Sequence, residues 1–409
     1  MIVLTGMIAL ILGVVAGLGG FVYLNLPNTD KLIIGEDIVY SYNNSDEVNK
    51  IELTGADGEF SVHFLELGNK YTGDCTYIKY KDIDILIDCG SRANSISTVA
   101  NYLNQYVADN KLEYVIVTHA HTDHYAGFAT STKIKSIFDL YECETIIDFG
   151  NATNQTTGST YKNYLRELND EIDKGAKHYS AIDCYNNENG ASREFILDNE
   201  KNIKFEILLN EYQKYDNSLN NETFKAKTEN DYSVCTLFSY GERNFLFTGD
   251  LEAEGEQKLV ENNSVFTELK NNGNQYGVEL YKAGHHGSKT SSSQSLLECV
   301  RPEYVCVCCC AGSSEYTKTV DNQFPTQQFI DRISVYTDKV YVTTVCLDYQ
   351  ADNFSSMNGN IVIVVTELTI GINCSNNTTK LKDSEWFNKI IVDEKGVSRP
   401  NRVWQNWKK

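Results

Sequence analysis

Basic side chains are scarce in this sequence. It contains 36 Lys and Arg against 56 Asp and Glu, which gives a formal net charge of −20. Such a charge repels polyanions at long range, so a nucleic-acid partner is disfavoured unless basic side chains gather locally. Apolar residues, in contrast, make up 41% of the 409 positions. The chain can therefore bury a sizeable core in one large domain or two smaller ones, which argues against disorder.

Charged side chains are absent from the first 29 residues. The apolar run from Ile2 to Leu24 is long enough to cross a bilayer as a helix, so residues 1–27 are predicted to be a transmembrane anchor or a signal segment. The run lacks the opening Lys or Arg and the clear cleavage site of a signal peptide, which favours one uncleaved N-terminal transmembrane helix. A buried core helix is the alternative, but five glycines and no polar face disfavour it.

The next segment, residues 28–59, is interpreted as a linker and leading strand region. Residues 30–59 contain eight acidic and two basic side chains, without the Lys and Arg excess that retains a flank in the cytoplasm. The protein is therefore expected to be membrane-anchored with its main domain extracytoplasmic, or secreted if the N-terminal segment is cleaved.

Paired cysteine spacings are also missing, although the chain has 12 cysteines. The apolar run YVCVCCCAG, typical of a buried strand, contains Cys306, Cys308, Cys309 and Cys310. Neighbouring residues of a strand point to opposite faces, so these thiols cannot easily bridge one another. We expect free packing thiols rather than a disulfide scaffold or a structural zinc site, and a reducing or oxygen-poor setting would reconcile them with an outside location.

Strand and helix patterns interleave twice along the chain. In the first half, alternating strand segments precede a helix pattern at 95–109, an apolar strand at 113–118 and a second helix pattern at 162–177. In the second half, a hairpin through Gly241 is followed by alternating helices and strands up to residue 367. This predicts two α/β halves whose sheets face each other with helices outside, in one domain over 60–370 with a tail at 371–409.

Three of the seven histidines crowd into HAHTDH at residues 119–124. His119 and His121 are two apart, so in an extended segment both project to one side and can bind one ion. Asp123 and His124 then turn toward a neighbouring position. Imidazole nitrogen with carboxylate oxygen is a ligand set that zinc prefers, whereas calcium and magnesium do not need histidine.

Two further motifs follow apolar strands in the same way. LFTGD ends in Asp250, and AGHHGS contains His285 and His286. Loops at strand ends of a layered α/β fold meet at one sheet edge, where such folds place ligands, so these residues are expected to join the first motif. Of the two remaining histidines, His63 is interpreted as a structural side chain of a strand, and His178 is ambiguous.

HAHTDH, TGD and HHGS, in this order, resemble the metallo-β-lactamase superfamily. Longer runs resemble one branch of it, the hydrolase domain of the competence channel protein ComEC and its free-standing relatives. These runs are VHFLELGNKYTGDCTYIKYKDIDILIDCG, NDYSVCTLFSYGERNFLFTGDLE and YKAGHHGSKTSSSQSLLECVRPEYVCV. The resemblance extends from about Phe60 to Val345 and implies an αββα four-layer sandwich with one or two zinc ions, or manganese as an alternative, at the sheet edges.

The resemblance also implies a role for each motif residue. His119 and His121 would bind the first ion, and Asp123 and His124 the second. Asp250 would bridge both ions, and Asp123 and Asp250 would be the catalytic carboxylates. The implied ligands, in chain order, are His119, His121, Asp123, His124, Asp250, His285 and His286.

Three points of this assignment differ from the family pattern or stay open in it. One of His285 and His286 would complete the second site, and His285 is preferred because it directly follows the strand. The superfamily commonly has another histidine between the first two motifs, where His178 is the only one here. The His-Pro often seen in this branch is replaced by Phe324 and Pro325.

The chemistry implied is hydrolysis by a zinc-bound hydroxide, because zinc lowers the pKa of its water to about 7. Ser233, Ser288 and Lys289 lie close to the motifs and are candidates to hold a substrate phosphate, or else are ordinary polar loop residues. The leading interpretation is a metal-dependent phosphodiesterase acting on a nucleic acid strand or a phosphodiester-bearing surface polymer. The alternatives are a hydrolase of the lactamase or thioesterase type and a metal-binding, non-catalytic regulatory module.

Overall fold

The computed structural model describes residues 33–35, 38–40, 60–129, 135–150, 158–216, 221–393 and 396–405. The chain divides into two compact units, Met1–Lys50 and Ile51–Lys409, which are considered separately. In the first unit, β1 (Ile33–Gly35) pairs with β2 (Ile38–Tyr40) as an antiparallel hairpin. The predicted membrane segment, residues 1–27, lies outside the described residues. Among the residues that are described, no helix is both long and apolar enough to span a bilayer.

The second unit contains two large mixed sheets. In the first sheet, an antiparallel part leads into parallel strands from β5 onward. From edge to edge it consists of β18 (Ile370–Cys374), β17 (Ile361–Val365), β3 (Phe60–Phe64), β4 (Thr76–Tyr80), β5 (Ile83–Ile87), β6 (Lys111–Val117), β7 (Glu142–Asp148) and β8 (Lys177–Ser180).

The second sheet repeats this plan. Its antiparallel strands β9 to β12 lead into the parallel strands β12 to β15, and β16 closes the edge. From edge to edge it consists of β16 (Asn353–Ser356), β15 (Val340–Asp348), β14 (Tyr304–Ala311), β13 (Leu280–Lys282), β12 (Arg243–Phe247), β11 (Cys235–Tyr240), β10 (Ile203–Leu208) and β9 (Glu194–Asp198).

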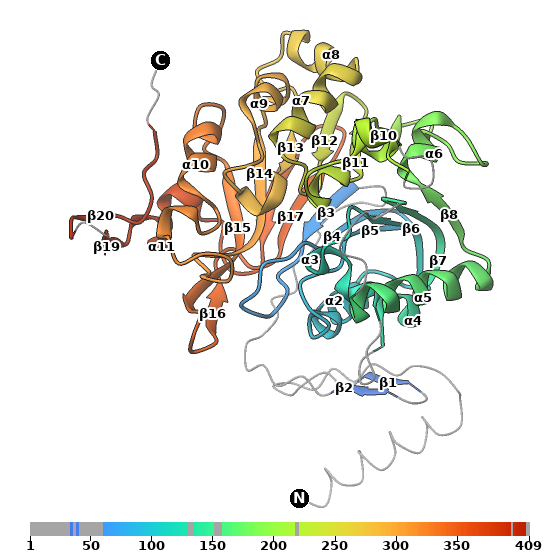
Figure 1. The fold of residues 1–409 in the computed structure, drawn as a ribbon, viewed down its shortest axis with the longest axis horizontal. Helices are drawn as coiled ribbons and strands as arrows, with labels where there is room; N and C mark the ends of the chain where they lie inside the picture. The colour runs from blue at the N-terminus through green and yellow to red at the C-terminus, as the bar shows by residue number, and fades with distance from the viewer. Residues whose placement is uncertain are drawn as a thin grey trace, which may run out of the picture. The chain divides into compact units, whose positions relative to one another are not determined.

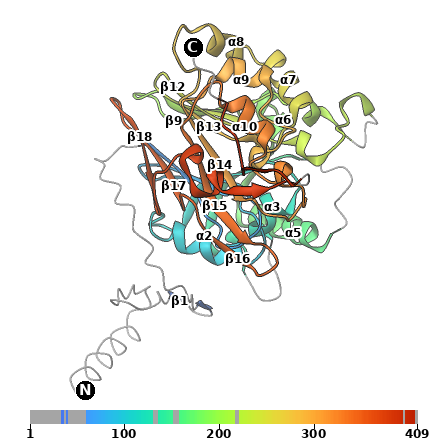
Figure 2. The same cartoon turned by 90° about the vertical axis from the view of Figure 1, so that its left-hand side faces the viewer.

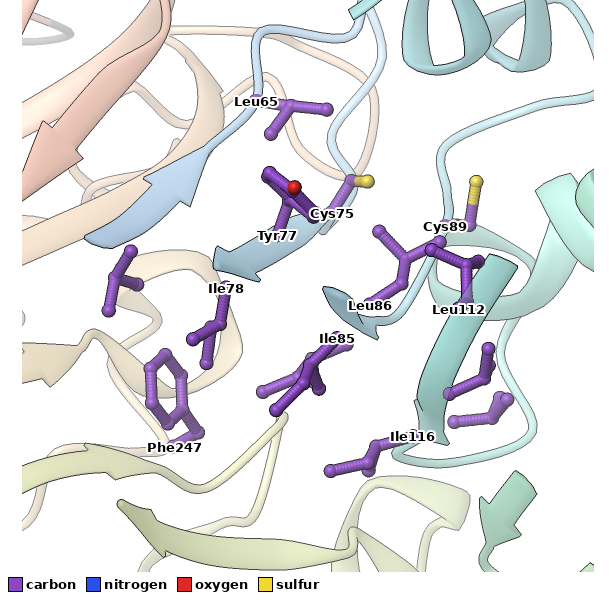
Figure 3. Close-up of a cluster of buried hydrophobic side chains, with 14 of the residues drawn as sticks. Leu65, Cys75, Tyr77, Ile78, Ile85, Leu86, Cys89, Leu112, Ile116 and Phe247 are labelled. Atoms are coloured by element: carbon purple, nitrogen blue, oxygen red, sulfur yellow. The ribbon is translucent and has the colours of Figure 1, made fainter. Parts of the chain in front are cut away.

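The two sheets pack face to face, and helices cover their outer faces (Figure 1 and Figure 2). On β12, Phe245 and Phe247 join the core between the sheets, whereas Leu246 points to the opposite face and packs under helices. This is the period-two alternation of a strand buried on both sides. Figure 3 shows Phe247 of the second sheet beside Ile78 and Ile85 of the first. The predicted four-layer α/β architecture is confirmed.

The outer helices form two groups. The first sheet is covered by α2 (Ser95–Leu103), α4 (Ile137–Leu140) and α5 (Ser159–Lys174), and the second by α7 (Ala253–Asn262), α8 (Val265–Asn271), α9 (Gln294–Val300) and α10 (Gln327–Ile333). α6 (Ala181–Asn186) lies between β8 and β10.

All 12 cysteines lie in the described residues and are free thiols, and most of them are buried. On β14, Cys306 and Cys308 face the core between the sheets, whereas Cys309 packs with the helix side. The expected packing thiols on opposite faces of one strand are therefore observed.

Described residues beyond 370 are part of the folded unit. β18 belongs to the first sheet, so the boundary expected at residue 370 falls within a strand. Arg402 is only 1% exposed, and its guanidinium donates hydrogen bonds to the carbonyls of Val320, Gln323 and Pro325. This segment thus braces the chain between β14 and α10.

Candidate metal centre

The ends of the parallel strands bring the sequence motifs together. β6 ends at Val117 and is followed by His119, while β12 and β13 of the other sheet are followed by Asp250 and His286. Between β6 and α3 (Thr122–Tyr125), His119 is fully buried and His121 has an extended backbone. Nε2 of His119 and Nδ1 of His121 are 3.0 Å apart. Two nitrogens that share one zinc ion are about 3.3 Å apart, so this pair is arranged to hold one ion.

The main chain around Asp123 and His124 is held against the loops of the first sheet. The amide of Asp74 donates to the carbonyl of Asp123 at 3.0 Å, and the amide of Cys89 donates to the carbonyl of His124 at 2.7 Å. A Cβ on Gly90 would collide with the Asp123 carbonyl, so glycine is required at this position. This close packing fixes the turn that carries both site residues.

His124 is oriented by a buried carboxylate. Its Nδ1 lies 2.7 Å from Oδ2 of Asp88, and Asp88 in turn accepts hydrogen bonds from the amide and hydroxyl of Thr118. Engagement of Nδ1 leaves the lone pair of Nε2 directed away from Asp88, as in histidines that bind metals. Nε2 of His124 lies 3.2 Å from Oδ2 of Asp250.

His286 is oriented in the same manner by a main-chain carbonyl. Its Nδ1 lies 2.8 Å from the carbonyl oxygen of Cys308 on β14. Its Nε2 lies 3.3 Å from Oδ2 of Asp250 and 3.5 Å from Oδ2 of Asp123. Oδ2 of Asp250 therefore lies within 3.3 Å of two imidazole nitrogens, and Asp123 approaches the same histidine, His286. Ligand atoms of Asp74, His124, Asp250 and His286 all lie within 4.8 Å of one another, as in a group that could hold a metal ion.

Unpaired buried atoms support a cation at this point. Nε2 of His124, Nε2 of His286 and Oδ1 of Asp250 are buried without a hydrogen-bond partner among the described residues. Burial alone would raise the pKa of Asp250, but the neighbouring His124 and His286 hold it well below its ordinary value. The same burial lowers the pKa of His119, which keeps its nitrogens free to act as ligands. This donor set fits zinc or a similar divalent ion.

His285 lies at the rim of the centre rather than in it. Its side chain is 21% exposed, against 1% for His286, and its Nε2 is 3.9 Å from Oδ2 of Asp250. Its Nδ1 faces Thr290 at 3.2 Å and Glu252 at 3.5 Å. The sequence favoured His285 as the residue that completes the second site, but in the structure His286 points into the centre. Both residues have a left-handed backbone in the turn at Gly284–Gly287, which turns His286 inward.

The three candidate phosphate-binding residues occupy different positions. Ser233 is fully buried, and its hydroxyl accepts a hydrogen bond from the Asp250 amide at 3.0 Å, so it supports a ligand instead of facing solvent. The hydroxyl of Ser288 is shared with Thr290 at 3.0 Å. Lys289 is exposed and reaches Asn322 at 3.4 Å. Only Lys289 is freely accessible to a substrate approaching from outside.

The two other histidines make contacts apart from the centre. Nε2 of His178 on β8 lies 3.1 Å from Oδ1 of Asp148. Burial alone would lower the pKa of His178, but this carboxylate outweighs burial and raises the pKa. His63 contacts Tyr102 at 2.7 Å and Ser61 at 2.8 Å inside the core, as expected of a structural side chain.

Four residues near the centre were not singled out from the sequence. Asp88 follows β5 as Asp250 follows β12, so its place at a strand end was an available signal. Asp74 and Lys282 form an ion pair in which both side chains are at most 3% exposed. The available signal for this pair was a lysine in the apolar strand before HHG. Tyr316, on the segment between β14 and α10, donates its hydroxyl to Oδ2 of Asp123 at 2.9 Å. No pattern marked that contact.

Comparison with known proteins agrees with this geometry. Residues 68–137 and 223–311 match the family described as the metallo-beta-lactamase superfamily. A stretch of 120 residues, 29% of this chain, is 29% identical to "Recombination protein 2" of Haemophilus influenzae and covers 13% of it. A stretch of 119 residues, 28% of this chain, is 35% identical to "Competence protein ComA" of Neisseria gonorrhoeae and covers 14% of it.

The matched stretches thus span only a small part of these relatives' length. Among solved structures, the metallo-beta-lactamase fold protein YhfI from Bacillus subtilis is 11% identical, with a TM-score of 0.36 over 70% of this chain and 96% of that chain. The chain is thus similar to the metallo-beta-lactamase superfamily over residues 68–137 and 223–311, and to competence proteins over the shorter stretches given above.

Proposed function

We propose that this protein is a metal-dependent phosphodiesterase. The observation that carries the proposal is that Oδ2 of Asp250 lies 3.2 Å and 3.3 Å from the Nε2 atoms of His124 and His286, with Oδ2 of Asp123 3.5 Å from the latter. Both Nε2 atoms are buried and lack a hydrogen-bond partner among the described residues. Zinc bound in such a centre supplies Lewis acidity and activates water at neutral pH. No serine or cysteine nucleophile is required.

The protein residues hold this chemistry in place. Asp88 and the Cys308 carbonyl fix the tautomers of His124 and His286, so that both present Nε2 to the ion. Asp123 is the carboxylate nearest the open side, because its Oδ2 meets the hydroxyl of Tyr316, a residue that is 57% exposed. A substrate therefore approaches past Tyr316, and Asp123 is placed to accept the proton of the attacking water.

Two arguments support a phosphodiester as substrate. The relatives that share about a third of their residues over the matched stretches are named for recombination and competence, processes that involve nucleic acid strands. An exposed cation also lies close to the HHGS motif in an otherwise acidic protein, because Lys289 is exposed and its side-chain contact, Asn322 at 3.4 Å, is neutral. A strand of nucleic acid and a phosphodiester-bearing surface polymer both present the same anionic group to this side chain.

The test is metal analysis followed by turnover on model substrates. The full chain in detergent, reconstituted with zinc, is expected to retain one or two ions and to hydrolyse bis(4-nitrophenyl) phosphate. Manganese reconstitution should be compared in the same assay. Less than about half an ion per chain would contradict the proposal, because a centre with four converging ligands binds zinc tightly. Faster hydrolysis of a lactam or a thioester than of the phosphodiester would favour the other reaction classes instead, and bound zinc without any turnover would favour a regulatory module.

We further propose that residues 1–27 anchor the protein with its main domain outside the cytoplasm. The support is the absence of charge in residues 1–29 and the acidic flank that follows. Protease added to intact cells should then remove the main domain. Full protection, in cells whose other surface proteins are cut, would contradict this placement.

A further inference from the structure

Asp74 and Lys282 form an ion pair beside the metal centre that the proposed reaction does not use. Asp74 belongs to the loop before β4 of the first sheet, and Lys282 is the last residue of β13 in the second sheet. Their side chains are 1% and 3% exposed. The pair therefore links the two sheets in a buried place, where an uncompensated charge is costly.

Asp74 lies near the Nδ1 atoms of His286 and His124. Its Oδ1 lies 3.3 Å from Nδ1 of His286, and its Oδ2 lies 3.7 Å from Nδ1 of His124. These are the nitrogens that Cys308 and Asp88 already engage, not the Nε2 atoms that face Asp250. Asp74 offers an oxygen within 4.8 Å of ligand atoms of His124, Asp250 and His286, but the imidazole nitrogens that it approaches are the Nδ1 atoms.

Lys282 is fixed by all of its hydrogen-bond donors. Besides Asp74, its ammonium donates to the carbonyl oxygens of Gly249 at 3.2 Å and Ala283 at 3.3 Å. An ammonium has three donors, so each has a partner. The same ammonium lies 3.8 Å from Oδ1 of Asp250, whose other oxygen, Oδ2, faces the histidines.

We propose that Lys282 is a positioning residue that holds Asp74 on the Nδ1 side of the two histidines, outside the set of metal ligands. The inference rests on the metal-dependent function proposed above. A carboxylate this close to a divalent ion would otherwise compete to bind it, and the lysine charge removes that competition.

The experiment compares the wild-type protein with Asp74→Asn, Lys282→Met and the double variant. Cobalt(II) replaces zinc, because its visible spectrum reports the ligands, and affinity is measured by chelator competition. Asp74→Asn should keep the wild-type spectrum and ion number, with affinity reduced by no more than about 100-fold, the range of changes outside the ligand set. Lys282→Met should bind cobalt with an altered spectrum and melt at a lower temperature without metal. The double variant should recover the wild-type spectrum and most of the melting temperature.

Loss of an ion or a changed cobalt spectrum in Asp74→Asn, as expected for Asp250→Asn, would make Asp74 a ligand and overturn the inference. The inference would also be overturned if the losses of cobalt affinity and melting temperature in the two single variants added up in the double variant. If Lys282→Met does not fold, the Asp74→Asn and double variants decide the question alone.

A second, partly buried ion pair serves as the control. Lys79 and Asp84 face each other across the β4–β5 hairpin, with Nζ and Oδ1 2.8 Å apart. Lys79→Met and Asp84→Asn should change the melting temperature without changing cobalt affinity or spectrum. Because none of these measurements uses turnover, a protein that binds metal but hydrolyses no phosphodiester would refute the proposed reaction and leave this inference standing.

Discussion

The two pairs of histidines reach the metal centre along different backbone paths. His119 and His121 alternate on an extended segment, which places their nitrogens 3.0 Å apart. His285 and His286 are adjacent in a left-handed turn, and their ring centroids lie 6.0 Å apart. The first pair acts together, whereas the second divides into an inner residue and a rim residue.

This difference shows that the spacing of residues defines a shared site only when the backbone conformation is known. In an extended chain, positions i and i+2 always share a side. In a turn with positive φ, two neighbours can point either way, and burial decides between them. Substitutions at the centre can therefore test whether the two pairs contribute as differently as their geometry indicates.

The largest effect is expected from Asp250→Ala, because Oδ2 of Asp250 contacts both His124 and His286. Its loss leaves the imidazole ligands without their shared carboxylate. Metal content should fall together with turnover, and turnover should fall by more than the about 100-fold that changes outside the ligand set cost. Elemental analysis and steady-state kinetics check both quantities.

His178→Ala is the control for this experiment. Since His178 contacts Asp148 and not the centre, its replacement should lower the melting temperature by a few degrees and keep turnover within about threefold, as for loss of one hydrogen bond. Equal and severe losses in both variants would instead make His178 the missing ligand.

The next largest effect is expected to distinguish His286 from His285. His286→Ala should lose metal and activity almost as severely as Asp250→Ala, because it removes a buried donor at 3.3 Å from Oδ2. His285→Ala should keep its metal and lose about tenfold or less in turnover, the value of a rim hydrogen bond. The reverse order of losses would restore His285 as the ligand.

The smallest of the three effects is expected at Tyr316, which contacts Asp123 in the loop that follows His119 and His121. Tyr316→Phe removes the hydroxyl that meets Asp123 at 2.9 Å, a hydrogen bond to a charged group. Turnover should fall by about 10- to 100-fold with metal content unchanged, because such a bond contributes about 1.5–3 kcal/mol. Tyr349→Phe, at a tyrosine whose ring contacts that of Tyr71, is the control and should leave turnover unchanged. Metal loss in Tyr316→Phe would assign the residue to the structure of the centre instead.

The sequence was informative where chemistry follows from local spacing. Alternation predicted that neighbouring thiols of β14 point to opposite faces, and the HAHTDH spacing predicted which histidines share a side. The choice between His285 and His286 depends on two positive φ values, and residue type alone does not specify these outside glycine. Asp74 and Lys282 lie more than 200 residues apart, so only the packing of the two sheets brings them together.

The buried guanidinium of Arg402 has a practical consequence for recombinant fragments. It holds the carbonyls of Gln323 and Pro325, on either side of Phe324, whose ring lies 5.7 Å from that of His285 and 5.8 Å from that of His286. A fragment that stops at residue 370 lacks the guanidinium that donates hydrogen bonds to those carbonyls. Phe324, beside the two histidines, is then no longer held by those bonds. Expression plasmids for assays should therefore encode the chain at least to residue 405, and affinity tags belong beyond that point.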